Sequence, residues 1–223
     1  MKSLWLVTLY ALLTPHGNAP IHRPTQLSVS QVSEYDLSIK VFPDLHRLEV
    51  TGTWRLPPAP AARNEIEFYL SPKMEGLAVQ LLEPKASAPL NLQSSKEEGG
   101  DTKRIFKPAL PIPAAQSILL RFSYTSDGKS APQFKVSPEG SFAGGGGELW
   151  YPQTAYKNRE VGTLRFKVPA GETAFSNGVL ESTPQEKATG EFIFRVTEPL
   201  KFAFASGKYS VTRREGAVPF NLY

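Results

Sequence analysis

The sequence predicts an all-β, sandwich-like fold with mainly antiparallel sheets, and three observations lead to this prediction. Apolar and polar residues alternate with a period of two in several segments, as in strands that bury one face. Twenty prolines and 17 glycines among 223 residues suit many short strands separated by turns. After the first 19 residues, no segment keeps the 3.6-residue period of an amphipathic helix.

The first 19 residues have the pattern of a secretory signal peptide. Lys2 supplies a short positive region, and the apolar run LWLVTLYALL follows at residues 4–13. Gly17 and Ala19 are small residues of the kind that precede a signal-peptidase cleavage site. A membrane-spanning helix needs roughly 20 apolar residues, about twice the length of this run. We therefore expect a secreted or periplasmic protein that has no membrane span after cleavage.

Composition and charge narrow the class of protein further. Cysteine is absent, so a secreted domain of this size has to be held together by its core, which favours a bacterial periplasmic or secreted protein over a small disulfide-rich module. The formal net charge is +4, and no run of five basic residues occurs. This pattern indicates solvated sheet faces and disfavours a nucleic-acid partner.

The alternating segments predict the strands in chain order. Residues 20–34 are polar and lack a period, which indicates a leader or linker before one domain at residues 35–223. A hairpin with a turn at Pro43-Asp44 comes first, and its inward row is Tyr35, Leu37, Ile39, Val41, Leu48, Val50, Gly52, Trp54 and Leu56. Further strands are expected at 66–70, 77–81, 118–124, 163–168, 192–196, 202–204 and 209–211. Residues 85–102 are expected to form an exposed hairpin tip or loop.

Residues 148–178 lie at the centre of the predicted fold. In the strand at 163–168, Leu164, Phe166 and Val168 point to one face, and the residues between them point to the other. Asn177-Gly178 then predicts a type I′ hairpin turn, because that turn needs a positive φ at both central positions.

A tetraglycine at residues 144–147 stands just before Trp150 and Tyr151. Flexible glycines beside large amphipathic side chains suit a loop that closes over a neighbouring site or docks against a partner.

No constellation of catalytic or metal-binding residues is recognisable. Only His22 and His46 follow the signal peptide, and neither H-E-x-x-H nor G-x-S-x-G occurs. Aromatic residues make up 11% of the chain, which raises sugar or peptide binding as a possibility, but most of them stand at inward strand positions. No metal and no cofactor is therefore expected in this chain.

Six segments stand in a recognisable order between residues 35 and 223: YDLSIKVFPDLHRLEVTGTWRLP, NEIEFYLSP, SILLRFSYTSDG, WYPQTAYKNREVGTLRFKVPAGETAFSNGVLES, TGEFIFRVTEPLKFAFASGKYSV and GAVPFNLY. Their order and spacing resemble the N-terminal β-domain of the aminopeptidase N family, the zinc aminopeptidases of the gluzincin type. The most specific points are the Tyr151-Pro152 step, the SNG turn at residues 176–178 and the FASGKY strand at residues 204–209.

The resemblance implies a saddle of mainly antiparallel sheet that helps to roof the active site of a following thermolysin-like catalytic domain. The zinc ligands and the catalytic glutamate would belong to that domain, so this chain would be an isolated domain, a truncated product or a fragment. Family members place a Gln or Glu ahead of the proline step against the free amine of the substrate. The T-Q-x-E-P pattern and the following aspartate-proline are absent here. Glu148 is the nearest candidate, with Trp150, Tyr151 and Gln153 as further substrate-contact or interdomain candidates. The resemblance also implies that residues 144–153 face the missing catalytic domain and that in this chain alone they leave an apolar patch exposed.

Two function classes follow from these observations. The chain is either a non-catalytic domain of a secreted zinc metallopeptidase or a stand-alone secreted β-sandwich module that binds peptide or glycan. The first requires an H-E-x-x-H motif in the same or the next reading frame, and the second does not.

Secreted protein should begin at or near Pro20, because Gly17-Asn18-Ala19 follows a short apolar region. The intact mass of exported material measures this directly. Material that is exported with residues 1–19 still attached would contradict the prediction.

Overall fold

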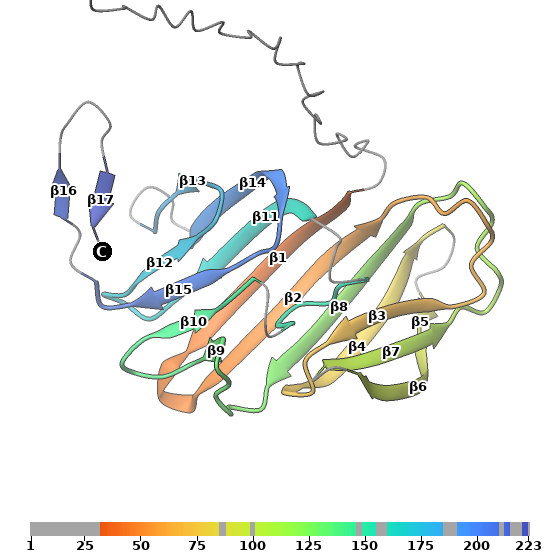
Figure 1. Ribbon diagram of the computed structural model, residues 1–223, viewed down its shortest axis with the longest axis horizontal. Coiled ribbons are helices and arrows are strands. Elements are labelled where there is room, and N and C mark those ends of the chain that lie inside the picture. Colours follow the sequence, from red (N-terminus) through yellow and green to blue (C-terminus); the bar gives the residue numbers. More distant parts are fainter. Residues whose placement is uncertain are drawn as a thin grey trace, which may run out of the picture.

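A computed structural model describes residues 32–84, 88–98, 101–145, 149–154, 160–184, 191–209, 212–214 and 220–222. Within these ranges every regular element is a strand except the 3-10 turn Pro43–Leu45 (Figure 1). No helix in the described ranges is long and apolar enough to cross a membrane. The predicted all-β class with mainly antiparallel pairing is confirmed.

The largest sheet has eight strands in the order β13-β14-β11-β1-β2-β8-β4-β5. Its neighbours pair antiparallel, with the exception of β1 and β11, which are parallel. The strands are β1 Ser33–Phe42, β2 Arg47–Leu56, β4 Met74–Glu83, β5 Ala88–Pro89, β8 Ile118–Ser126, β11 Glu160–Lys167, β13 Val179–Ser182 and β14 Phe192–Leu200.

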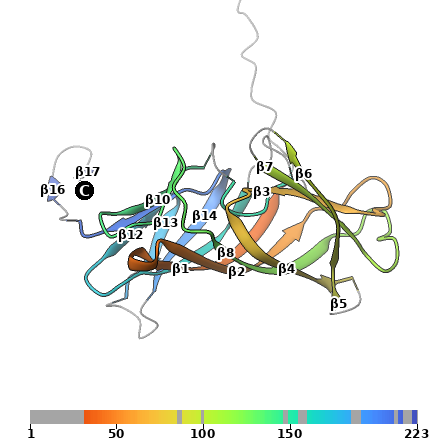
Figure 2. The same cartoon turned by 90° about the horizontal axis from the view of Figure 1, so that it is seen from below.

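Two smaller sheets pack on the same side of the large sheet, near its two ends (Figure 2). The four-stranded sheet has the order β12-β15-β10-β9, and the three-stranded sheet the order β3-β7-β6. Their strands are β3 Ile66–Leu70, β6 Asn91–Glu98, β7 Asp101–Lys107, β9 Phe134–Lys135, β10 Ser141–Ala143, β12 Thr173–Ser176 and β15 Phe204–Gly207; β16 Thr212–Arg214 and β17 Phe220–Leu222 form a separate pair. The result is an open, saddle-like arrangement of sheets.

The predicted first hairpin is present as β1 and β2, in a register that sets Tyr35 opposite Trp54. The apolar side chains of the predicted inward row are all buried. Gly52 lies in the middle of this row because a Cβ there would approach the carbonyl oxygen of Asp36 to 2.6 Å and the side chain of Leu37 to 2.8 Å. The alternating pattern therefore located this part of the core correctly.

Strand β11 joins the two halves of the large sheet, since it pairs with β1 on one side and β14 on the other. Leu164 and Phe166 are fully buried. The Phe166 ring lies 5.9 Å from that of Phe194 and 5.3 Å from that of Phe204, centroid to centroid. Phe166 therefore connects the large sheet to the four-stranded sheet.

The hairpin predicted at Asn177-Gly178 is wrong, although a turn is present. Strands β12 and β13 flank this turn but belong to different sheets. Gly178 has a φ of 103°. The side chain of Asn177 binds a distant segment: its Nδ2 donates to the Lys201 carbonyl at 2.8 Å, and its Oδ1 accepts from the Ala203 amide at 3.0 Å. The turn moves the chain from one sheet to the other, which local turn chemistry does not reveal.

The structure also revises two other expectations about strands. Within residues 85–102 the expected hairpin exists as β6 and β7, but both partners are regular strands, and residues 91–97 are exposed. Strand β7 is ordered by pairing with β3 on its other side. The strand expected at 209–211 does not include Tyr209, which follows β15 outside any strand, and Val211 lies outside the described residues.

Replacing Phe166 with Ala should lower the free energy of unfolding by about 3–5 kcal/mol, because it empties a fully buried aromatic site. Arg165→Ala on the opposite face is the control, and we expect it to stay within about 0.5 kcal/mol of neutral. Its guanidinium pairs with Asp36 at the surface, where ion pairs contribute little to stability. Denaturant melts that show equal losses for both variants would contradict the assigned faces.

Candidate functional site

The segment at residues 149–154, here called the central segment, crosses between the sheets without belonging to any strand. The Leu149 carbonyl accepts from the Ser71 amide at 2.8 Å. Gln153 exchanges two backbone hydrogen bonds with Tyr69, at 2.7 and 3.0 Å. On its other side, the Trp150 indole nitrogen donates to the Phe202 carbonyl at 3.1 Å. The central segment therefore connects the three-stranded sheet to the chain that leads into β15.

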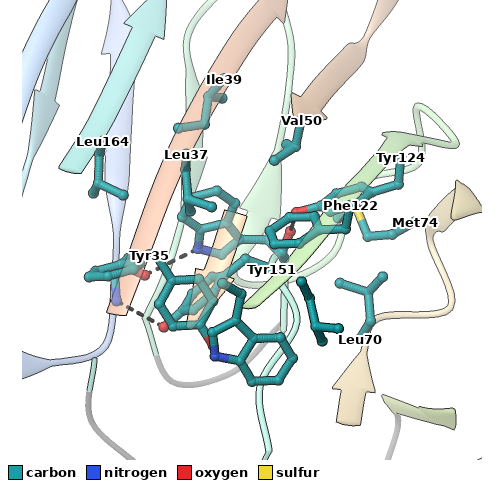
Figure 3. Packing of buried hydrophobic residues seen from close by; sticks show 14 of the residues in the cluster. Tyr35, Leu37, Ile39, Val50, Leu70, Met74, Phe122, Tyr124, Tyr151 and Leu164 are labelled. Carbon is teal, nitrogen blue, oxygen red and sulfur yellow. Dashed lines mark hydrogen bonds between the residues drawn. The ribbon is translucent and has the colours of Figure 1, made fainter. Parts of the chain in front are cut away.

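Two tyrosines of the large sheet hold the central segment from below. The Tyr35 hydroxyl donates to the Pro152 carbonyl at 2.7 Å, and the Tyr124 hydroxyl donates to the Trp150 carbonyl. Burial raises the pKa of both tyrosines well above the usual value, so they stay protonated and able to donate. Figure 3 shows Tyr35, Tyr124 and Tyr151 together among the buried apolar side chains.

The exposed apolar patch predicted for residues 144–153 is wrong. Trp150 and Tyr151 have 0% of their surface exposed, and Gln153 has 1%. The Trp150 ring packs on Tyr151 and Phe204, at centroid distances of 5.0 and 5.2 Å. Phe204, and Phe202 against which Tyr151 packs, lie about 50 residues further along the chain. For that reason the sequence did not identify Trp150 and Tyr151 as core residues.

Gly144 and Gly145, which precede the central segment, lie where a side chain would be crowded by neighbouring residues. A Cβ at Gly145 would lie 3.0 Å from the Cβ of Lys201, and one at Gly144 would lie 3.0 Å from Oε1 of Gln133. Glu148 lies outside the described residues, so its contact with a substrate stays a prediction. The substrate or interdomain roles of Trp150, Tyr151 and Gln153 also stay predictions, and the structure places all three side chains inside the domain.

A buried polar cluster lies at the end of the central segment and consists of Tyr151, Gln153, Glu160 and Lys201. The Lys201 ammonium contacts Oε1 of Glu160 at 3.0 Å and also donates to the amide oxygen of Gln153. Tyr151 donates to Oε2 of Glu160 at 3.1 Å, and its oxygen accepts from the Phe202 amide at 3.1 Å. Glu160 is 1% exposed, so both of its oxygens find their partners inside the protein.

Burial sets the protonation behaviour of this cluster. Burial raises the pKa of the Glu160 carboxyl above its usual value, although the neighbouring Lys201 and the Tyr151 hydroxyl act in the opposite direction. Burial likewise lowers the pKa of the Lys201 ammonium, against the attraction of Glu160. Through these contacts the cluster holds Tyr151 and Gln153 of the central segment to Glu160 at the start of β11 and to Lys201.

Sequence reasoning missed Glu160 and Lys201. A signal existed for Glu160, because it stands in the same period-two row as Leu164 and Phe166, at the buried start of β11. No signal existed for Lys201, which precedes the buried Phe202 and Phe204 as an ordinary polar residue. A lysine that becomes partly buried by long-range packing leaves no mark in a local pattern.

Other candidate sites are weaker. Among the described residues, no group of three or more His, Cys, Asp or Glu side chains could hold a metal ion. His46 lies in the left-handed region at the first hairpin turn, where its Nδ1 contacts the Val136 carbonyl at 2.9 Å. An open pocket on the large sheet is lined by residues of β2, β4 and β8 that include Glu49 and Glu75.

No family model and no curated protein matches the chain. Among solved structures, the M1 zinc metallopeptidase of Deinococcus radiodurans, as its E323A mutant, is similar over 86% of this chain and 46% of its own chain, with 17% identity and a TM-score of 0.63. The same mutant with a bound Tyr-Ser-Ala substrate is similar over 82% and 43%, with a TM-score of 0.59. An aminopeptidase N family protein of Idiomarina loihiensis matches over 85% and 32%, with 10% identity and a TM-score of 0.54.

These similarities confirm the resemblance in fold that the sequence predicted. At 17% identity or less they concern the fold alone. The chain spans less than half the length of the solved proteins that it matches. The arrangement of sheets in this chain is thus shared with one part of larger metallopeptidases.

Trp150→Ala should lower the free energy of unfolding by about 3–5 kcal/mol, because it removes a fully buried ring and leaves the Phe202 carbonyl without its indole donor. Phe142→Ala is a suitable control, because Phe142 is 39% exposed on β10 and its truncation should cost about 1 kcal/mol or less. Urea denaturation of both variants gives the comparison, and a near-neutral Trp150→Ala would contradict the anchoring role of the central segment.

Proposed function

We propose that this chain is a non-catalytic β-domain of a secreted or periplasmic zinc metallopeptidase of the aminopeptidase type. The observation that carries the proposal is the extent of the fold match, which covers 86% of this chain but only 46% of the D. radiodurans enzyme. A fold that accounts for less than half of a metallopeptidase is consistent with a domain that works beside a catalytic one. The N-terminal pattern of residues 1–19 supports export.

In this proposal the domain forms a rigid roof over the active site of a thermolysin-like catalytic domain, which supplies the zinc. Rigidity comes from the central segment, whose carbonyls are held by Tyr35, Tyr124 and Ser71. Glu148 stands directly before the anchored Leu149. Its carboxylate would pair with the free amine of a peptide substrate, since an ammonium and a carboxylate form a charge-assisted hydrogen bond.

The second candidate function is a stand-alone secreted module that binds peptide or glycan. Phe142 and Tyr209 favour it, because each is 39% exposed. Exposed aromatic rings supply stacking surfaces for apolar ligand faces. The two functions differ in one requirement, which is the presence of a zinc-binding partner.

The DNA that encodes this chain distinguishes the two functions. We expect an H-E-x-x-H motif in the continuation of the reading frame or in the next one, since two histidines one helical turn apart bind zinc and the glutamate acts as general base. The purified assembly should then hold zinc and release an aminoacyl dye, with activity lost on chelation. His→Ala at the first histidine of the motif is the control. A genomic neighbourhood without such a motif, together with binding of peptide or glycan by this chain alone, would favour the second function.

A further inference from the structure

The outward face of the four-stranded sheet carries a row of apolar side chains. The strand register sets Phe175 opposite Ala205 and Ala205 opposite Phe142, so the three form one row across β12, β15 and β10. Residues on either side of this row, such as Ala174 and Phe204, are buried against the large sheet. Because side chains alternate along a strand, Phe142, Ala205 and Phe175 point away from the core.

Tyr209 extends this row beyond the end of β15. Its ring packs edge-on against Phe175, with 5.1 Å between centroids and 71° between the planes. It can do so because Gly207 has no side chain: a Cβ there would lie 3.3 Å from the Tyr209 ring. We call Phe142, Phe175, Ala205 and Tyr209 the outer aromatic face. Phe142 and Tyr209 each remain 39% exposed.

The outward faces of the other two sheets carry ion pairs, and the exposed large apolar side chains of those sheets, Leu92, Val179 and Leu180, lie on the edge strands β6 and β13. The large sheet presents ion pairs there, Asp36 with Arg165, Arg55 with Glu83, Arg47 with Glu49 and Arg195 with Glu181. The three-stranded sheet presents the pair Lys103–Glu67, at 2.9 Å. Charged faces of this kind are stable in water. An apolar aromatic row with charges such as Lys135 and Glu139 at its rim has instead the composition of an interface core.

We propose that the outer aromatic face is the surface on which the catalytic domain docks, an inference that rests on the proposed function. The path of the chain identifies this occupant. Strand β15 is the last strand of the three packed sheets, and Tyr209 directly after it lies on this face. The chain therefore leaves the three packed sheets here, and Figure 1 shows β16 and β17 beyond this end of the molecule.

The size of the proposed occupant fits as well. The shared fold makes up 46% of the D. radiodurans chain, so more than half of that chain lies outside it. A body of that size, joined to this chain at the end where Tyr209 lies, is large enough to cover the outer aromatic face. The docking surface is thus placed on β10, β12 and β15, and not on the buried aromatic residues of the central segment.

The test uses this chain and the polypeptide that carries the H-E-x-x-H motif, either mixed as two proteins or joined as one enzyme. Phe142→Asp places a charge at the β10 end of the face, and Leu110→Asp places the same charge on an exposed leucine in the loop between β7 and β8, where Leu110 is 78% exposed. We expect Phe142→Asp to weaken association at least about tenfold and Leu110→Asp to change it less than about threefold. In the joined enzyme, amide hydrogen exchange on β10 and β12 should be slowed relative to this chain alone.

The possible outcomes separate the two proposals. Both variants should keep the near-UV circular dichroism of the parent, because both sites are exposed. Association that Phe142→Asp leaves unchanged, or exchange on β10 and β12 that the catalytic domain does not slow, would overturn the docking face while leaving the proposed function intact. A failure of the unmodified chain to associate with the zinc-binding polypeptide would contradict the proposed function itself. Dimers of this chain that Phe142→Asp abolishes would show that a second copy occupies the face, and would also overturn the inference.

Discussion

The structure depends on how the central segment satisfies its polar backbone inside an apolar core. A backbone carbonyl that is buried without a partner costs about 1–3 kcal/mol. The large sheet supplies the donors from two strands, with Tyr35 on β1 and Tyr124 on β8 reaching the carbonyls of Pro152 and Trp150. Because these hydroxyls have a fixed reach, they set where the segment lies above the large sheet. The two smaller sheets are then positioned by the same segment, through Tyr69 and Phe202.

The parallel pairing of β1 with β11 brings Tyr35 on β1 close to the start of β11, where Glu160 binds the central segment. Gly162 stands opposite Tyr35 in the register, with a φ of 156°, and a Cβ there would lie 2.1 Å from the Tyr35 carbonyl oxygen. Only glycine allows the two strands to approach so closely at this point. The pairing of β11 with β14 shifts its register between Glu160 and Gly162. This irregularity lies beside the buried carboxylate that receives Lys201 and Tyr151, and bulges of this kind often re-aim a side chain.

This chain and the D. radiodurans enzyme share a fold despite their low sequence identity, because a fold constrains the pattern of buried apolar residues more than their exact identities. At 17% identity most aligned residues differ between this chain and the D. radiodurans enzyme, yet the similarity in fold covers 86% of this chain. Cores tolerate extensive apolar substitution when volume and pattern are kept. Function is less transferable, because it resides in sites carried by the fold. For this reason a partner of this chain has to be inferred from its exposed residues, since its core residues indicate only the fold.

The sequence by itself determined which residues face inward in several strands. Alternation is a local property that follows from the backbone, so the inward rows of β1, β2 and β8 were predicted correctly, as were Leu164 and Phe166 of β11. The same alternation could also have placed Glu160 in the buried row of β11. It did not determine which sheet a strand joins: Asn177-Gly178 has the chemistry of a hairpin turn but connects two sheets. Nor did it show that Trp150 and Tyr151 are core residues, because their partners Phe202 and Phe204 lie about 50 residues away and only the assembled sheets bring them together.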